Sequence, residues 1–344
     1  MCKNSRSREA LKLLGTVIID EITQCDQIDE KILIEAFQLS VENRVFLLFY
    51  KKFHQQCKRN LISSFFHDPA EEEREIEVYH SILKEIANAA SKANLKFLVF
   101  KTLKPFPYLV SDLDILLPTT NSFYAFTDIL QKQGFRIMSS SSHVKILEKN
   151  LNGKSYSVDV HNRITAGGLE YIDKSHLWHD RKIYRFRGEE IYVPSPEWEL
   201  VIIAAHSVLK EFTISLADFF YTLYLLKEMD KSKLIEIVKE GDLVFPFSIF
   251  IEVINSIHRF LYSSALDECT ITPVSMLSKF LISKVKSDFK KNPRMPYVYP
   301  LYVPFLSHLL KLKSKPFQFF NILKNFSSPK MILLLFQFLK RFRR

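Results

Sequence analysis

Glycine is scarce in this chain: only 7 of its 344 residues are glycine, and the sequence contains no repeats or low-complexity tracts. Because glycine is the default residue of tight turns, this scarcity favours a helix-rich chain with few such turns. No apolar run approaches the roughly 20 residues that a membrane-spanning helix needs. The composition, with 47% hydrophobic and 25% charged residues, is globular, so disorder is not expected.

Cysteines are few and scattered. Cys2, Cys25, Cys57 and Cys269 show neither metal-binding nor redox spacing, and the first six residues do not resemble a secretory leader. These absences argue against a cysteine-based metal or redox site, and they indicate a reducing, cytoplasmic location.

Basic residues outnumber acidic ones, 48 to 38, which gives a formal net charge of +10. Such an excess favours polyanionic partners. The basic residues gather late, in segment 284–291 and in the segment from Pro316 onward, which mixes them with Phe and Leu. The final segment could lie on an anionic membrane or on nucleic acid, or it could be a terminal helix with a solvated basic end.

Two carboxylates, Asp112 and Asp114, stand at positions i and i+2 inside the apolar segment 108–118. On an extended chain they would share one face, while Leu113 and Ile115 pack behind the sheet. Two such close anions repel each other unless a cation lies between them, and Mg²⁺ commonly binds through one or two carboxylates plus substrate phosphates. The alternative is an edge strand whose polar face lies in water.

The sequence around this pair predicts a strand and helix order. Segment 96–101 has the composition of a short buried strand that ends in Lys101, and the prolines after it stop the strand. Residues 119–122 offer helix N-caps, and Gly134 offers a helix stop. Further strands are expected at 135–138, 143–147 and 154–164, with a hairpin turn at Asn152-Gly153. The last of these strands brings a third carboxylate, Asp159, and His161.

This order of elements resembles the nucleotidyltransferase fold of the DNA polymerase β superfamily. Within it, the chain is similar to a group of uncharacterised nucleotidyltransferase-like proteins with a lysine-bearing first strand, an Asp-hydrophobic-Asp strand and a later Asp-hydrophobic-His strand. The matching residues here are Phe100-Lys101, Asp112-Leu113-Asp114 and Asp159-Val160-His161. Segments 200–206 and 216–218 match the family's His-bearing helix and its helix with an internal Asp.

The resemblance implies a mechanism and a set of site residues. Asp112, Asp114 and Asp159 would hold two Mg²⁺ ions, with Mn²⁺ as the alternative, and transfer a nucleoside monophosphate from an NTP, expected to be ATP. Lys101, Thr102, Lys104 and Ser111 would bind the nucleotide, and His161 would support a carboxylate or contact phosphate. Nucleic acid, protein and small metabolites are the acceptors to consider.

One departure from the superfamily pattern bears on activity. Members usually carry Gly followed by Gly or Ser after the first strand, which lets backbone N–H groups approach the triphosphate. This chain has Thr102-Leu103 there, between Lys101 and Lys104. Either the lysines and the Thr102 hydroxyl take over phosphate binding, or nucleotide binding has been lost.

We therefore expect an α+β protein with a helical region at 1–94, a nucleotidyltransferase-like core with a small mixed sheet at 95–195, and a helical region with a basic tail at 196–344. The first hypothesis is a metal-dependent nucleotidyltransferase. The second is an inactive nucleotide- or RNA-binding module, or the antitoxin-like partner of another protein. The third, a basic protein of the membrane surface, rests only on the C-terminal segment.

Overall fold

The computed structural model describes residues 2–19, 27–57, 67–166, 169–266, 276–300 and 302–313. A seven-stranded mixed sheet has the order β3-β4-β5-β2-β1-β9-β8, so that β2, which carries Asp112 and Asp114, is its central strand. The strands β2 and β5 run parallel, as do β1 and β9, and the other neighbours are antiparallel. The expected α+β class with a mixed sheet is confirmed. The sheet strands are β1 (Leu98–Phe100), β2 (Asp112–Leu116), β3 (Arg136–Ser140), β4 (Val144–Leu151), β5 (Lys154–His161), β8 (Lys182–Phe186) and β9 (Glu189–Val193).

Helices precede, cover and follow the sheet. Those in the first part of the chain and within the sheet region are α1 (Cys2–Ile19), α2 (Glu30–Glu42), α3 (Phe46–Cys57), α4 (Pro69–Lys92), α5 (Thr120–Lys132) and α6 (Lys174–His179). The later ones are α7 (Pro196–His206), a π-helical turn (Ser207–Glu211), α8 (Leu216–Glu228), α9 (Lys231–Glu240), α10 (Val244–Tyr262), α11 (Met276–Lys291) and α12 (Tyr302–Lys313). The described residues also form two small antiparallel sheets of two strands each. One pairs β6 (Ile164–Ala166) with β7 (Leu169–Ile172), and the other pairs β10 (Thr213–Ile214) with the distant β11 (Tyr297–Val298).

The local signals in the sequence set several of these boundaries. Asp68 caps α4, accepting a hydrogen bond from the Ala70 N–H at 2.9 Å. Thr119 caps α5 in a reciprocal capping box with Ser122. Asn152 and Gly153 both have positive φ, 53° and 78°, which is the backbone that a two-residue hairpin between β4 and β5 requires.

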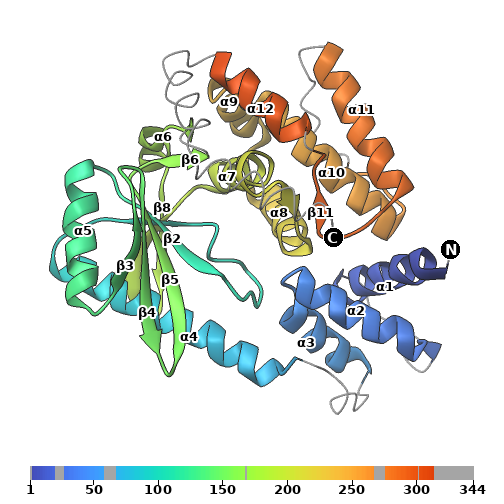
Figure 1. Cartoon of the computed structure of the whole chain (residues 1–344), viewed down its shortest axis with the longest axis horizontal. Coiled ribbons are helices and arrows are strands. Elements are labelled where there is room, and N and C mark those ends of the chain that lie inside the picture. Colours follow the sequence, from blue (N-terminus) through green and yellow to red (C-terminus); the bar gives the residue numbers. More distant parts are fainter. Residues whose placement is uncertain are drawn as a thin grey trace.

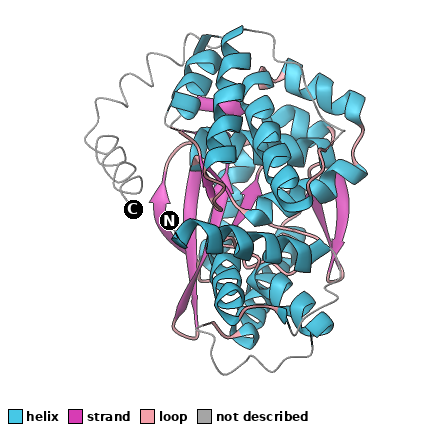
Figure 2. Ribbon diagram, turned by 90° about the vertical axis from the view of Figure 1, so that its right-hand side faces the viewer, coloured by secondary structure: helices cyan, strands magenta, loops and turns pink. Residues whose placement is uncertain are grey.

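The two faces of the sheet have different environments. On one face, Leu113 and Ile115 of β2 and Val158 of β5 pack with the apolar sides of α4 and α5. On the opposite face, Leu98, Phe100 and Leu116 join a second core formed by α1–α3 and the helices that follow the sheet. Figure 1 shows the sheet between α5 on its left and α7 and α8 on its right. Seen from that right-hand side, the helices lie in front of the strands (Figure 2).

Among the described residues, one helix, α10, is long and apolar enough to cross a membrane, and 67% of its most apolar window is buried inside the protein. The basic segment 284–291 lies on α11. The basic segment from Pro316 lies outside the described residues, so the proposed contact with a membrane or nucleic acid stays a prediction. Cys57, at the end of α3, is disulfide-bonded, which the scattered cysteine pattern did not predict.

The stability of β2 depends on the burial of the apolar side chains on the face opposite Asp112 and Asp114. Ile115 is fully buried, so Ile115→Ala should lower the free energy of unfolding by about 2–5 kcal/mol. The matched substitution Ile183→Ala, on β8 where the side chain is 62% exposed, should cost less than about 1 kcal/mol. Urea unfolding of both variants checks the difference, and equal losses would contradict this packing.

Candidate active site

Three possible ligand groups converge from two parallel strands. Asp114 of β2 lies directly opposite Asp159 of β5 in the sheet register, and His161 follows two residues later on the same face. One ligand atom from each of Asp114, Asp159 and His161 lies within 4.8 Å of the others, and all three residues are buried. Asp112 begins β2, opposite Ser157. It stands outside this close group, although its charge acts on Asp159.

The carboxylates strongly perturb one another. Burial, and then the charges of Asp112 and Asp114, raise the pKa of Asp159 to about 6. Burial, followed by the charge of Asp114, also raises the pKa of Asp112. Burial would raise the pKa of Asp114 as well, but the Lys101 ammonium and the His161 hydrogen bond outweigh it and hold that pKa well below its usual range. Burial and mutual repulsion therefore disfavour the charged forms of Asp112 and Asp159, while Lys101 and His161 keep Asp114 ionised.

Lys101 is the cation closest to these acids. Its Nζ lies 2.8 Å from Asp114 Oδ2 and 3.2 Å from His206 Nε2. The residue follows β1 and has a φ of 58°, a left-handed conformation that costs a side-chain-bearing residue on the order of 1 kcal/mol or more. Its backbone N–H donates to Glu199 Oε1 at 2.7 Å. Two buried carboxylates thus hold Lys101 in this conformation, one through its side chain and one through its backbone.

Glu199 supports the site from α7, where it is almost fully buried. Burial raises its pKa to about 7, against the opposing effects of Lys104 and the Lys101 N–H. Its Oε1 also accepts a hydrogen bond from the Tyr221 hydroxyl at 3.4 Å, while Oε2 has no partner among the described residues. Glu199 is therefore a positioning group, because its polar contact reaches the backbone of Lys101.

His206 stands behind Lys101, at the end of α7. Its Nδ1 lies 3.1 Å from the Tyr171 hydroxyl, so both ring nitrogens have partners. Burial and the nearby Lys101 charge lower its pKa to about 4, which makes the ring neutral at pH 7. Its sequence context, an apolar helix, predicts a hydrogen-bonded core histidine. The structure adds that it borders the acidic cluster.

The other predicted nucleotide-binding residues occupy different positions around the cluster. The Thr102 hydroxyl is buried, donates to the Phe100 carbonyl at 3.2 Å and accepts from the Asp114 N–H at 3.1 Å, so it ties β1 to β2. The Lys104 ammonium lies 4.5 Å from the ring centroids of both Tyr108 and Tyr221. Ser111 Oγ donates to Asp112 Oδ1 at 3.0 Å. Their roles in binding a nucleotide stay predictions.

A cleft of about 360 Å³ opens in front of the acids. Asp112 and Asp114 line it, together with Lys101, His206 and Lys210. Segments far apart in the sequence contribute to its walls, from Arg44 between α2 and α3 to Asp218 in the first turn of α8. Its size and mixed charge suit a small polar ligand.

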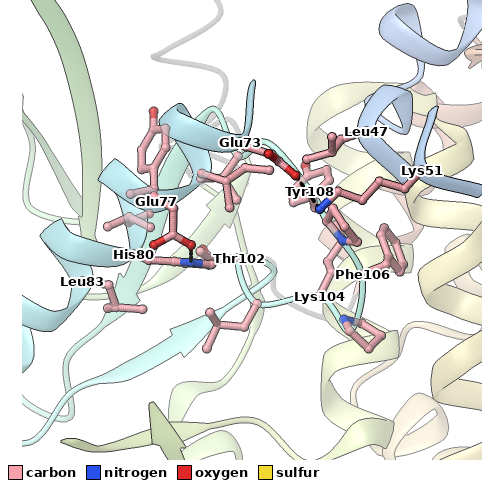
Figure 3. A pocket seen from close by; sticks show the side chains of 17 residues that line it. Leu47, Lys51, Glu73, Glu77, His80, Leu83, Thr102, Lys104, Phe106 and Tyr108 are labelled. Atoms are coloured by element: carbon pink, nitrogen blue, oxygen red, sulfur yellow. Dashed lines mark ion pairs between the residues drawn. The ribbon is translucent and has the colours of Figure 1, made fainter. Parts of the chain in front are cut away.

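A larger cavity, of about 640 Å³, lies on the other side of the loop that carries Thr102, Lys104 and Tyr108. Figure 3 shows it between these loop residues and α3 and α4. Its charged groups pair with one another or with nearby residues: Lys51 with Glu73 at 2.6 Å, and Glu77 with Arg187 at 2.7 Å. Since it lacks the clustered carboxylates, we assign the candidate chemistry to the smaller cleft.

Several residues of the site escaped the sequence analysis. Arg44, Glu199 and Lys210 lie outside the strand motifs, and only the tertiary fold brings them to the cleft. Glu199 did carry a signal, because a carboxylate directly before the apolar run 200–205 of α7 needs a partner if it is buried. Arg44 and Lys210 carried none.

The donor set fits a divalent cation. Carboxylate oxygens suit Mg²⁺ and Mn²⁺, and the His161 imidazole lies within the same group as a possible nitrogen ligand. Buried anions with too few neighbouring cations are stabilised by such an ion. The fold and this acidic group define a protein of the nucleotidyltransferase type.

Residues 34–257, more than half of the chain, match the family of uncharacterised nucleotidyltransferases. The chain belongs to this family, as its motifs predicted. None of the curated proteins matches it.

Two solved structures show limited similarity. A candidate nucleotidyltransferase of Thermotoga maritima is 20% identical, with 36% of this chain and 81% of that chain covered and a TM-score of 0.26. An antigenic nucleotidyltransferase-like protein of Paracoccidioides brasiliensis is 14% identical, with 51% and 92% covered and a TM-score of 0.33. The family match, rather than these similarities, establishes the class.

The buried carboxyl of Glu199 should make stability depend on pH. Its pKa is raised from 4.5 to about 7, so its contribution to folding is complete below the unfolded value and is lost as the pH rises through the folded value. The loss amounts to about 3 kcal/mol. Glu199→Gln cannot titrate, so the decrease in unfolding free energy between about pH 5 and pH 8 should be smaller in this variant by about that amount.

Urea unfolding at the two pH values measures this difference. Glu236→Gln, an exposed carboxyl on α9, serves as the control and should keep the pH dependence of the original protein. An identical pH dependence in Glu199→Gln and the original protein would show that Glu199 does not titrate in this range.

Proposed function

We propose that this protein transfers a nucleoside monophosphate from an NTP, with ATP as the expected donor, to an acceptor hydroxyl. The observation that carries the proposal is the convergence of Asp114, Asp159 and His161 from two parallel strands, with Asp112 beside them at a cleft. Membership of a nucleotidyltransferase family supports the reaction class.

Asp112, Asp114 and Asp159 would hold the divalent ions, Mg²⁺ or Mn²⁺, with His161 beside them. When bound, such ions neutralise phosphate charge and acidify an acceptor hydroxyl. The acceptor oxygen then forms a bond to the α-phosphorus while the bond from that phosphorus to the bridging oxygen breaks, and pyrophosphate leaves. Asp159, which faces Asp114 across the strands, is the group we assign to receive the hydroxyl proton.

The remaining residues bind and orient the substrate. Lys101 is held beside Asp114 by their ion pair at 2.8 Å, so its ammonium stays next to the carboxylates that would hold the ions. Lys104 and Lys210 line the cleft and supply positive charge for the phosphates. Positioning and charge are the main contributions that phosphoryl-group chemistry demands of a protein, and these residues would supply both.

A second candidate is a module that binds a nucleotide or RNA, or acts as an antitoxin-like partner, without turnover. The ammonium of Lys101 lies 2.8 Å from Asp114, where it already supplies a positive charge to that carboxylate. The Thr102 hydroxyl is also engaged within the protein. Both observations favour this second candidate, because groups of the protein itself already occupy part of the site that metal ions and nucleotide would need.

Two measurements separate these candidates. Calorimetric titration of ATP with and without Mg²⁺ should show metal-enhanced binding, and incubation with the nucleotide should release pyrophosphate if the first proposal holds. Incubation of labelled NTPs with total cellular RNA, protein and small metabolites should then identify the acceptor from the fraction that takes up the label. Binding without pyrophosphate release or labelling would favour the inert module.

Removal of one strand carboxylate should abolish turnover. Asp112→Asn and Asp159→Asn should each lower nucleotidyl transfer by about 100-fold or more, because an electrostatic group of the transition state is lost. Pyrophosphate release measures this, and circular dichroism checks that both variants fold. Asp128→Asn, on the exposed side of α5, should leave turnover unchanged. Full activity in both site variants would reject the assignment.

A further inference from the structure

Arg44 reaches the cleft from a part of the chain that lies outside the nucleotidyltransferase motifs. It occupies the turn between α2 and α3 with a φ of 58°, a left-handed conformation that a residue with a side chain rarely adopts. Its side chain lines the same cleft as Asp112, Asp114 and Lys101. This backbone closes the end of α2, where the Val45 N–H donates to the Ser40 carbonyl at 2.8 Å, and it places the residue at the cleft.

The turn is anchored by a buried neighbour. Asn43 is fully buried, and its side-chain oxygen accepts a hydrogen bond from the Leu216 N–H at 3.1 Å. Its carbonyl accepts a second bond from the Ala217 N–H at 3.3 Å. These bonds fix the turn against the first turn of α8, so the position of Arg44 relative to the acids is set by the fold.

The guanidinium of Arg44 retains free donor capacity. Its Nη1 contacts two neutral oxygens, the Tyr108 hydroxyl and Ser111 Oγ, both at 3.4 Å. Among the residues that the structure describes, no carboxylate lies close enough to form an ion pair with it. Because a guanidinium has five N–H donors, most of them can still bind an anion.

The loop after β1 offers few free donors to a phosphate. The Lys101 N–H, at the start of the loop that usually cradles phosphates, donates to Glu199, and the Lys101 ammonium pairs with Asp114. Lys104 lies over two aromatic rings. The loop has Thr102-Leu103 in place of small residues. Of this loop, the Lys104 ammonium is the group still able to supply charge to an anion in the cleft, so further donors must come from outside the loop. Arg44 and Lys210 line the cleft and have no carboxylate partner among the described residues.

Three acidic residues also lie near Arg44, and their own partners or exposure decide whether they neutralise its charge. Ser111 Oγ donates to Asp112 Oδ1 at 3.0 Å while it contacts Arg44, so a hydroxyl separates this guanidinium from the acid. Asp218 Oδ2 accepts from the N–H and hydroxyl of Ser215 at the start of α8. Glu42 lies at the cleft surface and is exposed. Arg44 is thus left as an accessible cation at the edge of the acidic group.

We propose that Arg44, held by Asn43 against α8, forms a binding subsite for the phosphate chain of the nucleotide and replaces the missing small-residue loop. This inference rests on the proposed function, since it assigns the polyphosphate of an NTP as the ligand. The subsite makes the N-terminal helices part of the nucleotide-binding site.

Arg44→Asn is the informative variant. Asparagine tolerates left-handed backbone better than most residues, so the turn should persist while the guanidinium is lost. In calorimetric titrations with Mg²⁺ present, binding of ATP and of inorganic tripolyphosphate should weaken at least tenfold, roughly the contribution of one charged hydrogen bond. Adenosine binding should not change, and Arg44→Lys should fall between the variant and the original protein.

The control is Arg136→Gln, which removes the same charge from the exposed strand β3 and should leave every affinity unchanged. If the original protein binds tripolyphosphate and Arg44→Asn binds it equally well, the Arg44 subsite is overturned while nucleotidyl transfer is not. If Arg44→Asn loses tripolyphosphate but the original protein releases no pyrophosphate from ATP, the subsite stands and nucleotidyl transfer fails. If the original protein binds neither ATP nor tripolyphosphate, both proposals are overturned.

Discussion

Repulsion among the carboxylates on β2 and β5 is the constraint on which the rest of this site depends. The sheet register puts Asp114 opposite Asp159, and buried side chains behind both strands prevent either strand from shifting. A shift of one residue would turn the apolar side chains toward the cleft and the acids into the core, at a cost far above that of the repulsion. The fold therefore imposes the negative charge, and cations must be brought to it.

The sequence predicted the strands that carry the acids better than their surroundings. Val158 and Val160 alternate with Asp159 and His161, a local pattern typical of a strand whose apolar face is buried. In the structure both valines are fully buried. The helix starts at Asp68 and Thr119 also follow from local hydrogen bonding. Each of these features is decided within a few residues, which is why they could be predicted.

Features that depend on distant contacts could not be predicted. The β9 strand pairs with β1 across about ninety residues. Positive φ at Lys101 has no local signal, because lysine offers none of the backbone freedom of glycine. Glu199, which stabilises that conformation, lies 98 positions away in the chain.

Lys101 and Arg44 share a physical arrangement that links the helical regions to the acids. Each is a cationic residue with left-handed backbone at the cleft, and in each case a buried polar residue makes hydrogen bonds that fix the local backbone: Glu199 of α7 bonds to Lys101, and Asn43 bonds to the start of α8. Such strained conformations persist only where surrounding contacts over-determine them. The helices α7 and α8 therefore act as the frame on which both cations are positioned. Since their core also includes α1–α3 and one face of the sheet, residues 95–195 alone would hold the acids but not the groups that position their cations.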